Sequence, residues 1–211
     1  MFLIDSANAL KIHKISHYYP IYGVTTNPTI LSKEASDTGD ILKELKTLLK
    51  NKPLYIQVAS LNYDGMIHEI TALKPLLSKE DFIKVPATKE GYRFMRKKHK
   101  EYNIAATAVV SLNQAMMSIA AGASELIVYV DRMIKNNLNP FALIMDIKDM
   151  IYDKNLDIKI IGASFKSKDQ IEDAMIAGCD YVTIPPELFE QAFTEDLTEL
   201  SVETFYKDAK K

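Results

Sequence analysis

A single lysine, Lys84, lies within the short apolar stretch Phe82–Val85, which is followed by Pro86. Pro86 has no N–H to give to a neighbouring strand, and Thr88 is a residue type that caps helices, so this stretch is typical of a strand tip that turns into a helix. Burial lowers the pKa of a lysine, and a neutral amine is a nucleophile toward carbonyl carbons. Lys84 is therefore a candidate Schiff-base lysine. The alternative is a lysine that extends to the rim or pairs with a carboxylate.

Short apolar runs that are typical of strands recur along the chain, and helix-like stretches separate them. β-Branched or aromatic residues support the strand interpretation. Apolar residues at helix spacing, as in Ile41–Leu49, support the helices. The eight runs are Phe2–Ile4, Ile21–Val24, Leu54–Val58, Phe82–Val85, Ile104–Ala108, Leu126–Val130, Ile158–Ile161 and Tyr181–Ile184.

Strands that alternate with helices form a parallel sheet covered by helices, and eight such units predict an α/β fold, a (β/α)8 TIM barrel. The competing architecture is an open doubly wound sheet, which usually carries a glycine-rich phosphate turn. No G-x-G-x-x-G or Walker A pattern occurs in the chain. No linker rich in serine or glycine divides it either, so we predict one domain over residues 1–211.

Two helices are expected after the last strand. A short one covers Leu188–Phe193, and an amphipathic one runs from about Leu197 to Lys210. The barrel does not require the second, whose apolar residues include Leu200 and Phe205. It would pack under the barrel or on a neighbouring subunit, and we expect a homo-oligomer.

Polar residues follow most of the predicted strands, and in this kind of barrel functional residues lie at the carboxyl ends of strands. Only the eighth strand, which ends at Pro185-Pro186, offers no chemical group. The polar residues at the other ends are Asp5, Thr25, Thr26, Asn27, Gln57, Ser60, Lys84, Thr107, Tyr129, Arg132, Ser164 and Lys166. Their convergence around an apolar-strand lysine favours a Schiff-base enzyme. Arg132 and Lys166, on adjacent strand ends, could hold a phosphate or be two solvated rim charges.

Composition and charge exclude other classes of protein. The net charge of −2 creates no field that would attract nucleic acid or an anionic membrane. No apolar run approaches the ~20 residues of a membrane span, and Phe2–Asp5 lacks the basic region of a signal peptide. The one cysteine, Cys179, cannot form an internal disulfide, which fits a reducing compartment. We therefore expect a cytoplasmic protein.

Two further patterns are better explained as surface features. His13 and His17 have a spacing that can bind zinc, but no H-E-x-x-H pattern or third ligand accompanies them, so no metal site is predicted. The basic run Arg93–Lys100 lies on the helix expected after the fourth strand. It favours a solvated helix face over a nucleic-acid site.

Two motifs carry a resemblance to a known family. Gly23–Ile30, with the sequence GVTTNPTI, resembles the transaldolase signature, and Ile83–Thr88, with the sequence IKVPAT, resembles the Schiff-base lysine motif of that family. The resemblance runs in order from Asp5 to Thr183. It includes Gln57-Val58, Thr107–Val109, Asn113–Ala115, Tyr129–Arg132, Ala163–Lys166 and Ala177–Cys179.

Within that family, the chain is similar to the short fructose-6-phosphate aldolase branch. Gln57 stands where transaldolases usually have Glu, Tyr129 where they usually have Phe, and Lys166 where they usually have Arg. Asp131 departs from the Asn that is usual in the aldolase branch, and a carboxylate next to Arg132 could draw its guanidinium from a phosphate. The residues after Arg132 also lack the glycine-rich segment of some relatives.

The resemblance implies a Schiff-base mechanism with no metal and no organic cofactor. Lys84 would attack the C2 ketone of a sugar phosphate, and cleavage between C3 and C4 would leave an enamine. A proton-shuttling water would be held by Gln57, Thr107 and Tyr129, and ketose hydroxyls by Asp5 and Asn27. The remaining substrate-binding residues would be Thr26 from the signature and Arg132, Ser164 and Lys166 at the phosphate.

The resemblance also implies a substrate and an assembly. The expected reaction is cleavage or formation of fructose 6-phosphate from dihydroxyacetone and glyceraldehyde 3-phosphate, in a ring-based decamer or a pentamer. The first alternative is a transaldolase that moves a dihydroxyacetone unit between sugar phosphates in the pentose phosphate pathway. The second is a barrel that binds a sugar phosphate without turning it over.

Overall fold

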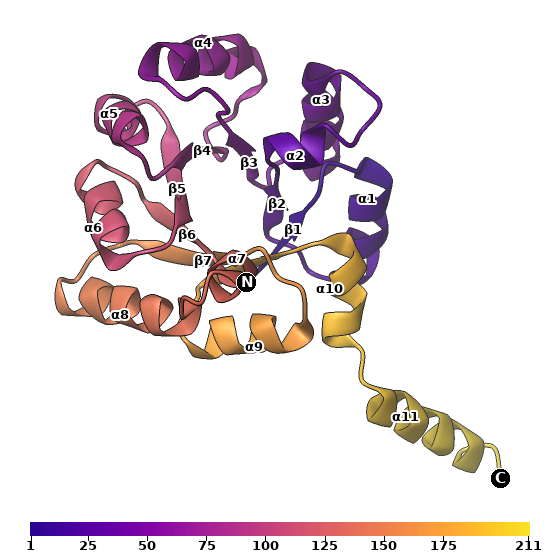
Figure 1. The fold of residues 1–211 in the computed structure, drawn as a ribbon. Coiled ribbons are helices and arrows are strands. Elements are labelled where there is room, and N and C mark those ends of the chain that lie inside the picture. Colours follow the sequence, from indigo (N-terminus) through magenta and orange to yellow (C-terminus); the bar gives the residue numbers. More distant parts are fainter.

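The computed structural model describes residues 1–211, and eight parallel strands close into a barrel (Figure 1). Each strand pairs with the next, and the first pairs with the last, with Phe2 in register with Val182. The predicted (β/α)8 barrel is therefore confirmed. The strands are β1 (Phe2–Asp5), β2 (Gly23–Thr25), β3 (Leu54–Gln57), β4 (Phe82–Pro86), β5 (Asn103–Val109), β6 (Glu125–Tyr129), β7 (Lys159–Ala163) and β8 (Tyr181–Ile184).

Helices connect the strands and surround the barrel (Figure 1). None of them is long and apolar enough to cross a membrane. As predicted, Thr88 caps the helix after β4, because its Oγ1 accepts the Gly91 N–H at 3.2 Å. The helices are α1 (Ala9–Tyr18), α2 (Pro28–Leu31), α3 (Thr38–Leu49), α4 (Tyr63–Leu73), the 3-10 turn η1 (Lys74–Leu76), α5 (Lys89–Lys98), α6 (Leu112–Ala120), α7 (Val130–Lys135), α8 (Pro140–Asp153), α9 (Lys168–Ile176), α10 (Pro186–Phe193) and α11 (Asp196–Asp208).

Strand ends differ from the sequence prediction by a residue or two. Val130 was expected to end a strand, but it begins α7. Pro86 was expected to stop pairing, but β4 includes it, in register with Thr107. The neighbouring Ala87 N–H donates to the Thr107 carbonyl at 2.9 Å, so the ladder continues without a donor from the proline.

Side chains point alternately to the two faces of each strand, so the core has two parts. One set of strand residues packs against the helices in a cluster of 43 buried residues. The other set fills the barrel as a cluster of seven, namely Leu3, Tyr55, Ala105, Ile127, Ile161, Ala163 and Tyr181. Because side chains two residues apart share a face, the residues that follow on the inner face are Asp5, Gln57, Thr107, Tyr129 and Thr183. Lys84 is in register with Gln57 and Ala105 and joins this inner face.

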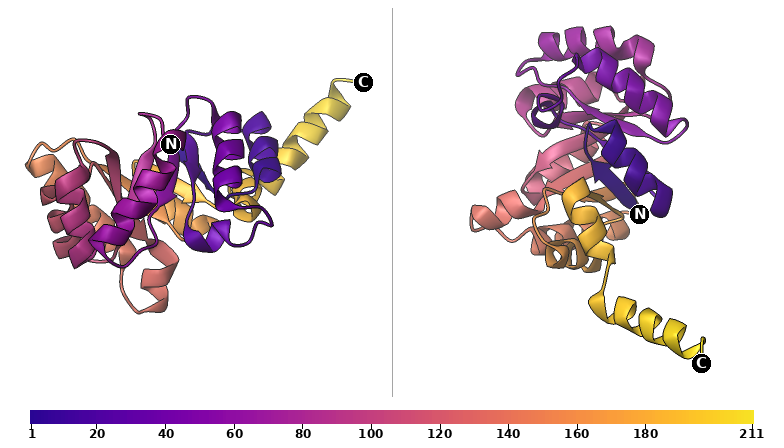
Figure 2. Two further views of the ribbon diagram at one scale, coloured as in Figure 1. Left: turned by 90° about the horizontal axis from the view of Figure 1, so that it is seen from above. Right: turned by 90° about the vertical axis from the view of Figure 1, so that its right-hand side faces the viewer.

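The last two helices, α10 and α11, differ in how they contact the barrel. α10 packs on the barrel, where the Phe193 ring lies 4.7 Å from that of Phe2. α11 projects away from the body in every view (Figure 2), and none of its residues is buried. Its large apolar side chains Leu197, Leu200, Val202, Phe205 and Tyr206 are all more than half exposed.

Candidate active site

A cavity of about 190 Å³ opens at the carboxyl ends of the strands. Seven of the ten predicted site residues line it, namely Asp5, Asn27, Lys84, Tyr129, Arg132, Ser164 and Lys166. Thr26, Gln57 and Thr107 do not. The other lining residues are Thr29, Ile30, Lys33, Ala163, Phe165, Thr183 and Pro185.

Lys84 reaches this cavity from β4 and is only 4% exposed. Its Nζ donates to the Thr26 carbonyl at 2.8 Å, and no carboxylate oxygen lies within 4 Å of it. The pKa of Lys84 is lowered to about 8. Burial is the main cause, the charge of Asp5 opposes the shift, and the charge of Arg132 adds to it. At pH 7 about one such amine in ten is neutral. Neither alternative for Lys84, a rim lysine or a partner of a carboxylate, describes this geometry.

Asp5 at the end of β1 accepts a hydrogen bond from Thr25, which in turn contacts Thr183. Thr25 Oγ1 donates to Asp5 Oδ1 at 2.7 Å and lies 2.6 Å from Thr183 Oγ1. Because Thr25 gives its one hydroxyl proton to Asp5, Thr183 must be the donor to Thr25. Burial raises the pKa of Asp5, and the nearby charge of Lys84 limits the rise. Asp5 is thus a fixed carboxyl group that can exchange a proton close to the amine.

Thr26 and Asn27 follow β2 and have different roles. The Thr26 side chain is fully buried and donates to the Tyr55 carbonyl at 3.0 Å, so only the backbone of Thr26 meets Lys84. Asn27 caps α2 by accepting the Ile30 N–H on its Oδ1 at 3.0 Å. Its Nδ2 makes no hydrogen bond within the protein, which leaves a donor for a ligand.

The proposed proton-shuttling trio is partly assembled. Thr107 Oγ1 donates to the Tyr129 hydroxyl at 3.3 Å, and Tyr129 lines the cavity. Thr107 itself is fully buried behind it. Gln57 lies beside Lys84 in register, and its Oε1 is buried without a hydrogen-bond partner. A buried amide oxygen needs a donor, and a water is the simplest group that could supply one.

Two cations and a serine gather at the β6 and β7 ends. The Arg132 guanidinium lies over the Tyr129 ring, with Cζ 4.6 Å from the ring centroid. No carboxylate oxygen lies within 4 Å of Arg132 or Lys166, so both charges are free for an anion. Ser164 has a φ of +67°, a left-handed conformation that non-glycine residues adopt mainly where the surrounding structure enforces it.

The Asp131 carboxylate makes no ion pair with Arg132 and so does not draw it from a phosphate. Asp131 instead pairs with Lys135 Nζ at 2.7 Å and accepts from Gln170 Nε2 at 3.4 Å. Both Asp131 and Arg132 lie on α7, and consecutive helix residues do not face each other. Asp131 is buried while Arg132 is exposed.

Sequence reasoning missed Thr183 and Lys33. Strand β8 offers a chemical group, contrary to the prediction, although its end at Pro185-Pro186 does not. Alternation places Thr183 on the inner face two residues after Tyr181, and this signal was available in the sequence. Lys33 lines the cavity from the residues after α2, and no local pattern identified it.

A second buried ionisable group lies inside the barrel, at the amino end of β6. Glu125 is 4% exposed, and its Oε2 has no hydrogen-bond partner. Burial raises the pKa of Glu125 to about 8, with the nearby Tyr55 hydroxyl opposing the shift. Glu125 does not line the cavity that contains Lys84.

The chain is similar to known proteins over nearly its whole length. The chain is 33% identical over 210 residues to a probable fructose-6-phosphate aldolase of Streptococcus pneumoniae, covering 98% of this chain and 95% of the relative. It is 34% identical to a probable transaldolase of Brevibacillus brevis (98% and 96% covered) and 30% identical to one of Methanococcus vannielii (98% and 96%). Residues 2–211 match the Transaldolase/Fructose-6-phosphate aldolase family model. The chain therefore belongs to the transaldolase/fructose-6-phosphate aldolase family.

Proposed function

We propose that the chain is a Schiff-base (class I) aldolase that cleaves or forms fructose 6-phosphate from dihydroxyacetone and glyceraldehyde 3-phosphate, acting as one barrel domain in the cytoplasm. The observation that carries the proposal is the buried Lys84. Its amine faces a polar cavity without a carboxylate partner, and its pKa is lowered to about 8. Membership of an enzyme family of this kind supports the same conclusion.

The first stage is imine formation on Lys84. The neutral amine attacks C2 of the open-chain ketose, the carbinolamine loses water, and the resulting iminium accepts electrons from the C3–C4 bond. Asp5, fixed by Thr25 and with a raised pKa, lies in the same cavity and can exchange the proton that leaves with this water. Asn27 Nδ2 offers a hydrogen bond to a ketose hydroxyl.

The second stage is cleavage and release. As the C3–C4 bond breaks, the C4 hydroxyl gives up its proton, and the glyceraldehyde 3-phosphate departs with a new carbonyl. The enamine on Lys84 then takes a proton at C3, and hydrolysis releases dihydroxyacetone. The Tyr129 hydroxyl, bonded to Thr107, can hold the water that carries these protons, and the unpaired Gln57 Oε1 can accept from the same water.

The phosphate end of the substrate fits the free cations. Arg132 is restrained by its stacking on Tyr129, and a guanidinium presents paired N–H groups that suit a phosphate. Ser164 and Lys166, also in the cavity wall, supply a hydroxyl and a second positive charge. Substrates without a phosphate should therefore bind less tightly.

Two alternatives remain distinct from this proposal. A transaldolase would keep the enamine until an aldose acceptor arrives, and the Tyr129 hydroxyl, which lies in the same cavity as Lys84, favours protonation instead. A non-catalytic sugar-phosphate binder would use Arg132 and Ser164 but would have no need of a buried lysine facing the cavity.

Two assays test the proposal. Borohydride added with dihydroxyacetone should reduce the imine and leave a stable mass increase at Lys84, and no adduct with any carbonyl substrate would reject the enzyme. Product analysis with fructose 6-phosphate should show free dihydroxyacetone without erythrose 4-phosphate. A strict need for that acceptor would favour the transaldolase.

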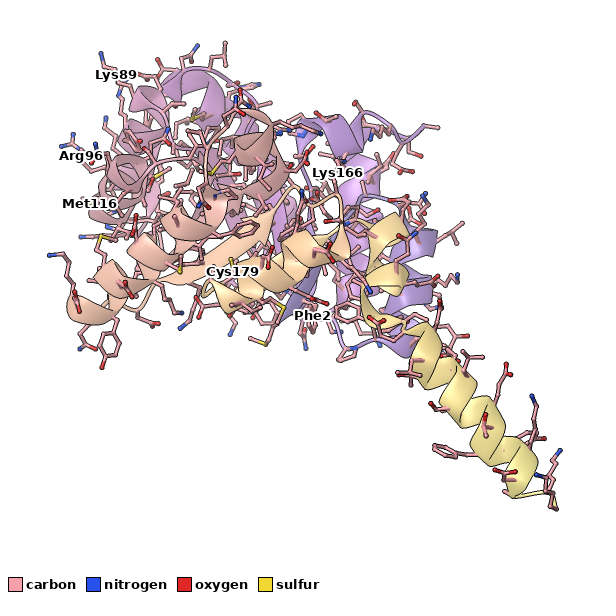
Figure 3. The ribbon with its side chains drawn as sticks, turned by 60° about the horizontal axis from the view of Figure 1, so that its bottom comes forward. Phe2, Lys89, Arg96, Met116, Lys166 and Cys179 are labelled. Carbon is pink, nitrogen blue, oxygen red and sulfur yellow. The ribbon has the colours of Figure 1, made fainter.

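We also propose a homo-oligomer, by resemblance a decamer or pentamer, in which α11 docks on a second copy of the chain. From Asp196 to Tyr206, α11 carries acidic but no basic residues together with its exposed apolar side chains. α5 is strongly basic, and Figure 3 shows Lys89, Arg96 and the exposed Met116 of α6 on the side of the barrel away from α11. An acidic apolar helix on one side and a basic face on the other make a head-to-tail contact, which can close into a ring.

Light scattering tests this assembly. The full chain should be larger than its 23.8 kDa monomer mass at micromolar concentration. A chain that ends at Thr194 keeps the Phe193 packing on the barrel and should form smaller particles. A monomeric full-length chain would exclude the assembly without affecting the proposed reaction.

A further inference from the structure

Two βα loops at the barrel mouth share one arrangement. Where β5 ends and α6 begins, Ala108 has a φ of +59°, Val109 is buried, Ser111 caps the helix and Gln114 lies three residues after the cap. In the β7–α9 loop, the same positions are Ser164 (φ +67°), Phe165, Ser167 and Gln170. Both loops therefore use a left-handed residue, a buried anchor and a Ser-x-x-Gln helix start.

The glutamine in each loop closes a capping box that reaches back one residue further than usual. Gln114 Oε1 accepts the Val110 N–H at 3.0 Å, and Gln170 Oε1 accepts the Lys166 N–H at 2.7 Å. The N–H of each glutamine donates to the capping serine at 3.3 Å. Each glutamine thus fixes the backbone of its own loop through its amide oxygen.

The amide nitrogens make different contacts, each to the segment that follows the preceding strand. Gln114 Nε2 donates to the Ala87 carbonyl at 3.2 Å, on the Lys84 side of the barrel. Gln170 Nε2 donates to Asp131 Oδ1 at 3.4 Å. A carboxylate can only accept and the Lys166 N–H can only donate, so the Gln170 amide has one orientation that satisfies both.

Asp131 completes the second connection. Its own N–H donates to the carbonyl of the left-handed Ser164 at 3.1 Å, while its carboxylate accepts from Gln170. The loop that carries Ser164 and Lys166 is therefore bound to α7 at both of its ends. Arg132 is the next residue on that helix.

We propose that Gln170, acting through Asp131, is a positioning residue that fixes Ser164 and Lys166 relative to Arg132 and so forms the anion subsite. This inference rests on the proposed function, because it names what holds the phosphate-binding end of the same cavity. Gln170 contacts no substrate atom in this scheme. Its loss should affect the phosphorylated substrate and leave the chemistry at Lys84 unchanged.

The experiment exchanges the donor and the acceptor of the hydrogen bond between Gln170 and Asp131. Gln170→Glu keeps an acceptor for the Lys166 N–H but sets two carboxylates against each other. Asp131→Asn combined with Gln170→Glu restores the hydrogen bond with its direction reversed, since the asparagine amide can donate to the glutamate. Gln114→Glu is the matched control, because it changes the equivalent box on the Lys84 side.

The readouts are KM and kcat with fructose 6-phosphate, and the yield of borohydride-trapped adduct with dihydroxyacetone, which has no phosphate. Gln170→Glu should raise KM about tenfold with the adduct yield within about twofold of wild type, and the double variant should restore KM to that of Asp131→Asn within about threefold. Thermal melting confirms that each variant is folded.

Three results would overturn the inference. The first is an equal loss in both readouts, the second is no recovery in the double variant, and the third is an equally selective rise in KM for Gln114→Glu. Should Gln170→Glu fail to fold, the double variant and the control still decide, because a KM in the double variant that stays more than about threefold above that of Asp131→Asn counts against the positioning role. A wild-type protein that forms no adduct and no product would instead reject the proposed function.

Discussion

Lys84 and Glu125 both lie on the inner face of the barrel, Lys84 in the middle of β4 and Glu125 at the amino end of β6, and they share two properties. Each is 4% exposed, and burial brings the pKa of each to about 8, from above for the amine and from below for the carboxyl. They differ in what surrounds them. Lys84 faces a cavity with Asp5, Tyr129 and Arg132, while Glu125 lies outside that cavity with an unpaired Oε2. A large pKa shift therefore marks burial, and only the cavity makes one of the two groups a candidate for catalysis.

Replacing the nucleophile should produce the largest effect. Lys84→Met should lower turnover of fructose 6-phosphate by on the order of 10⁴-fold or more, because the other two lysines of the cavity wall, Lys33 and Lys166, are exposed and do not replace a buried amine. Circular dichroism should show an intact fold, since the methionine fills much of the same space without a buried charge. A folded variant that keeps more than about 1% of the rate would remove Lys84 from the mechanism.

The carboxyl inside the barrel should matter for stability and not for turnover. The folded state holds a proton on Glu125 up to about pH 8, whereas an unfolded glutamate releases it near pH 4.5. The contribution of this group to stability is therefore full below pH 4.5 and is lost as the pH rises to 8. Glu125→Gln should abolish this loss and be more stable than wild type at pH 9 by a few kcal/mol.

Urea unfolding of wild type and Glu125→Gln at pH 5 and pH 9 measures that difference. Turnover of the variant should stay within about twofold of wild type. The contribution of Lys84 to stability changes with pH in the opposite direction and at higher pH. Its folded pKa is lowered to about 8 from 10.5, so its contribution to stability grows from pH 8 upward. A stability difference that does not change with pH would mean that Glu125 is ionised in the folded protein.

The rate of imine formation should follow the ionisation of Lys84. Below pH 8 the neutral amine falls tenfold per pH unit, so adduct formation should be about 100-fold slower at pH 6 than at its plateau above pH 8. The initial rate of borohydride trapping with dihydroxyacetone gives this profile. Glu125→Gln is the control and should leave it unchanged, and a midpoint near 10.5 would show an exposed, ordinary lysine.

The smallest effect is expected at Tyr129. Tyr129→Phe keeps the ring under Arg132 but loses the hydroxyl bonded to Thr107, so protonation of the enamine should slow several-fold. Release of dihydroxyacetone should fall while transfer to erythrose 4-phosphate rises. An unchanged ratio of the two products would mean that Tyr129 serves only as an aromatic platform.

The strands and Lys84 could be predicted from the sequence because short apolar runs and the residues at their ends are local signals. The family motifs also predicted most of the residues of the cavity wall. Side-chain contacts between different elements could not be predicted from local patterns. The stacking of Arg132 on Tyr129 and the pairing of Asp131 with Lys135 depend on where α7 begins. The Ser-x-x-Gln patterns at Gln114 and Gln170 were visible, but the partners of their amide nitrogens lie 27 and 39 residues away.

The barrel is closed by the contact between β1 and β8, which are the first and last strands to leave the ribosome. Phe2 and Val182 are separated by 180 residues, so at about 5–20 residues per second β1 waits on the order of 10–40 s for its second neighbour. During that interval both edges of the unfinished sheet are open to other chains. Because α11 follows β8, the segment proposed to join subunits is synthesised only after every strand is available, which places assembly after closure.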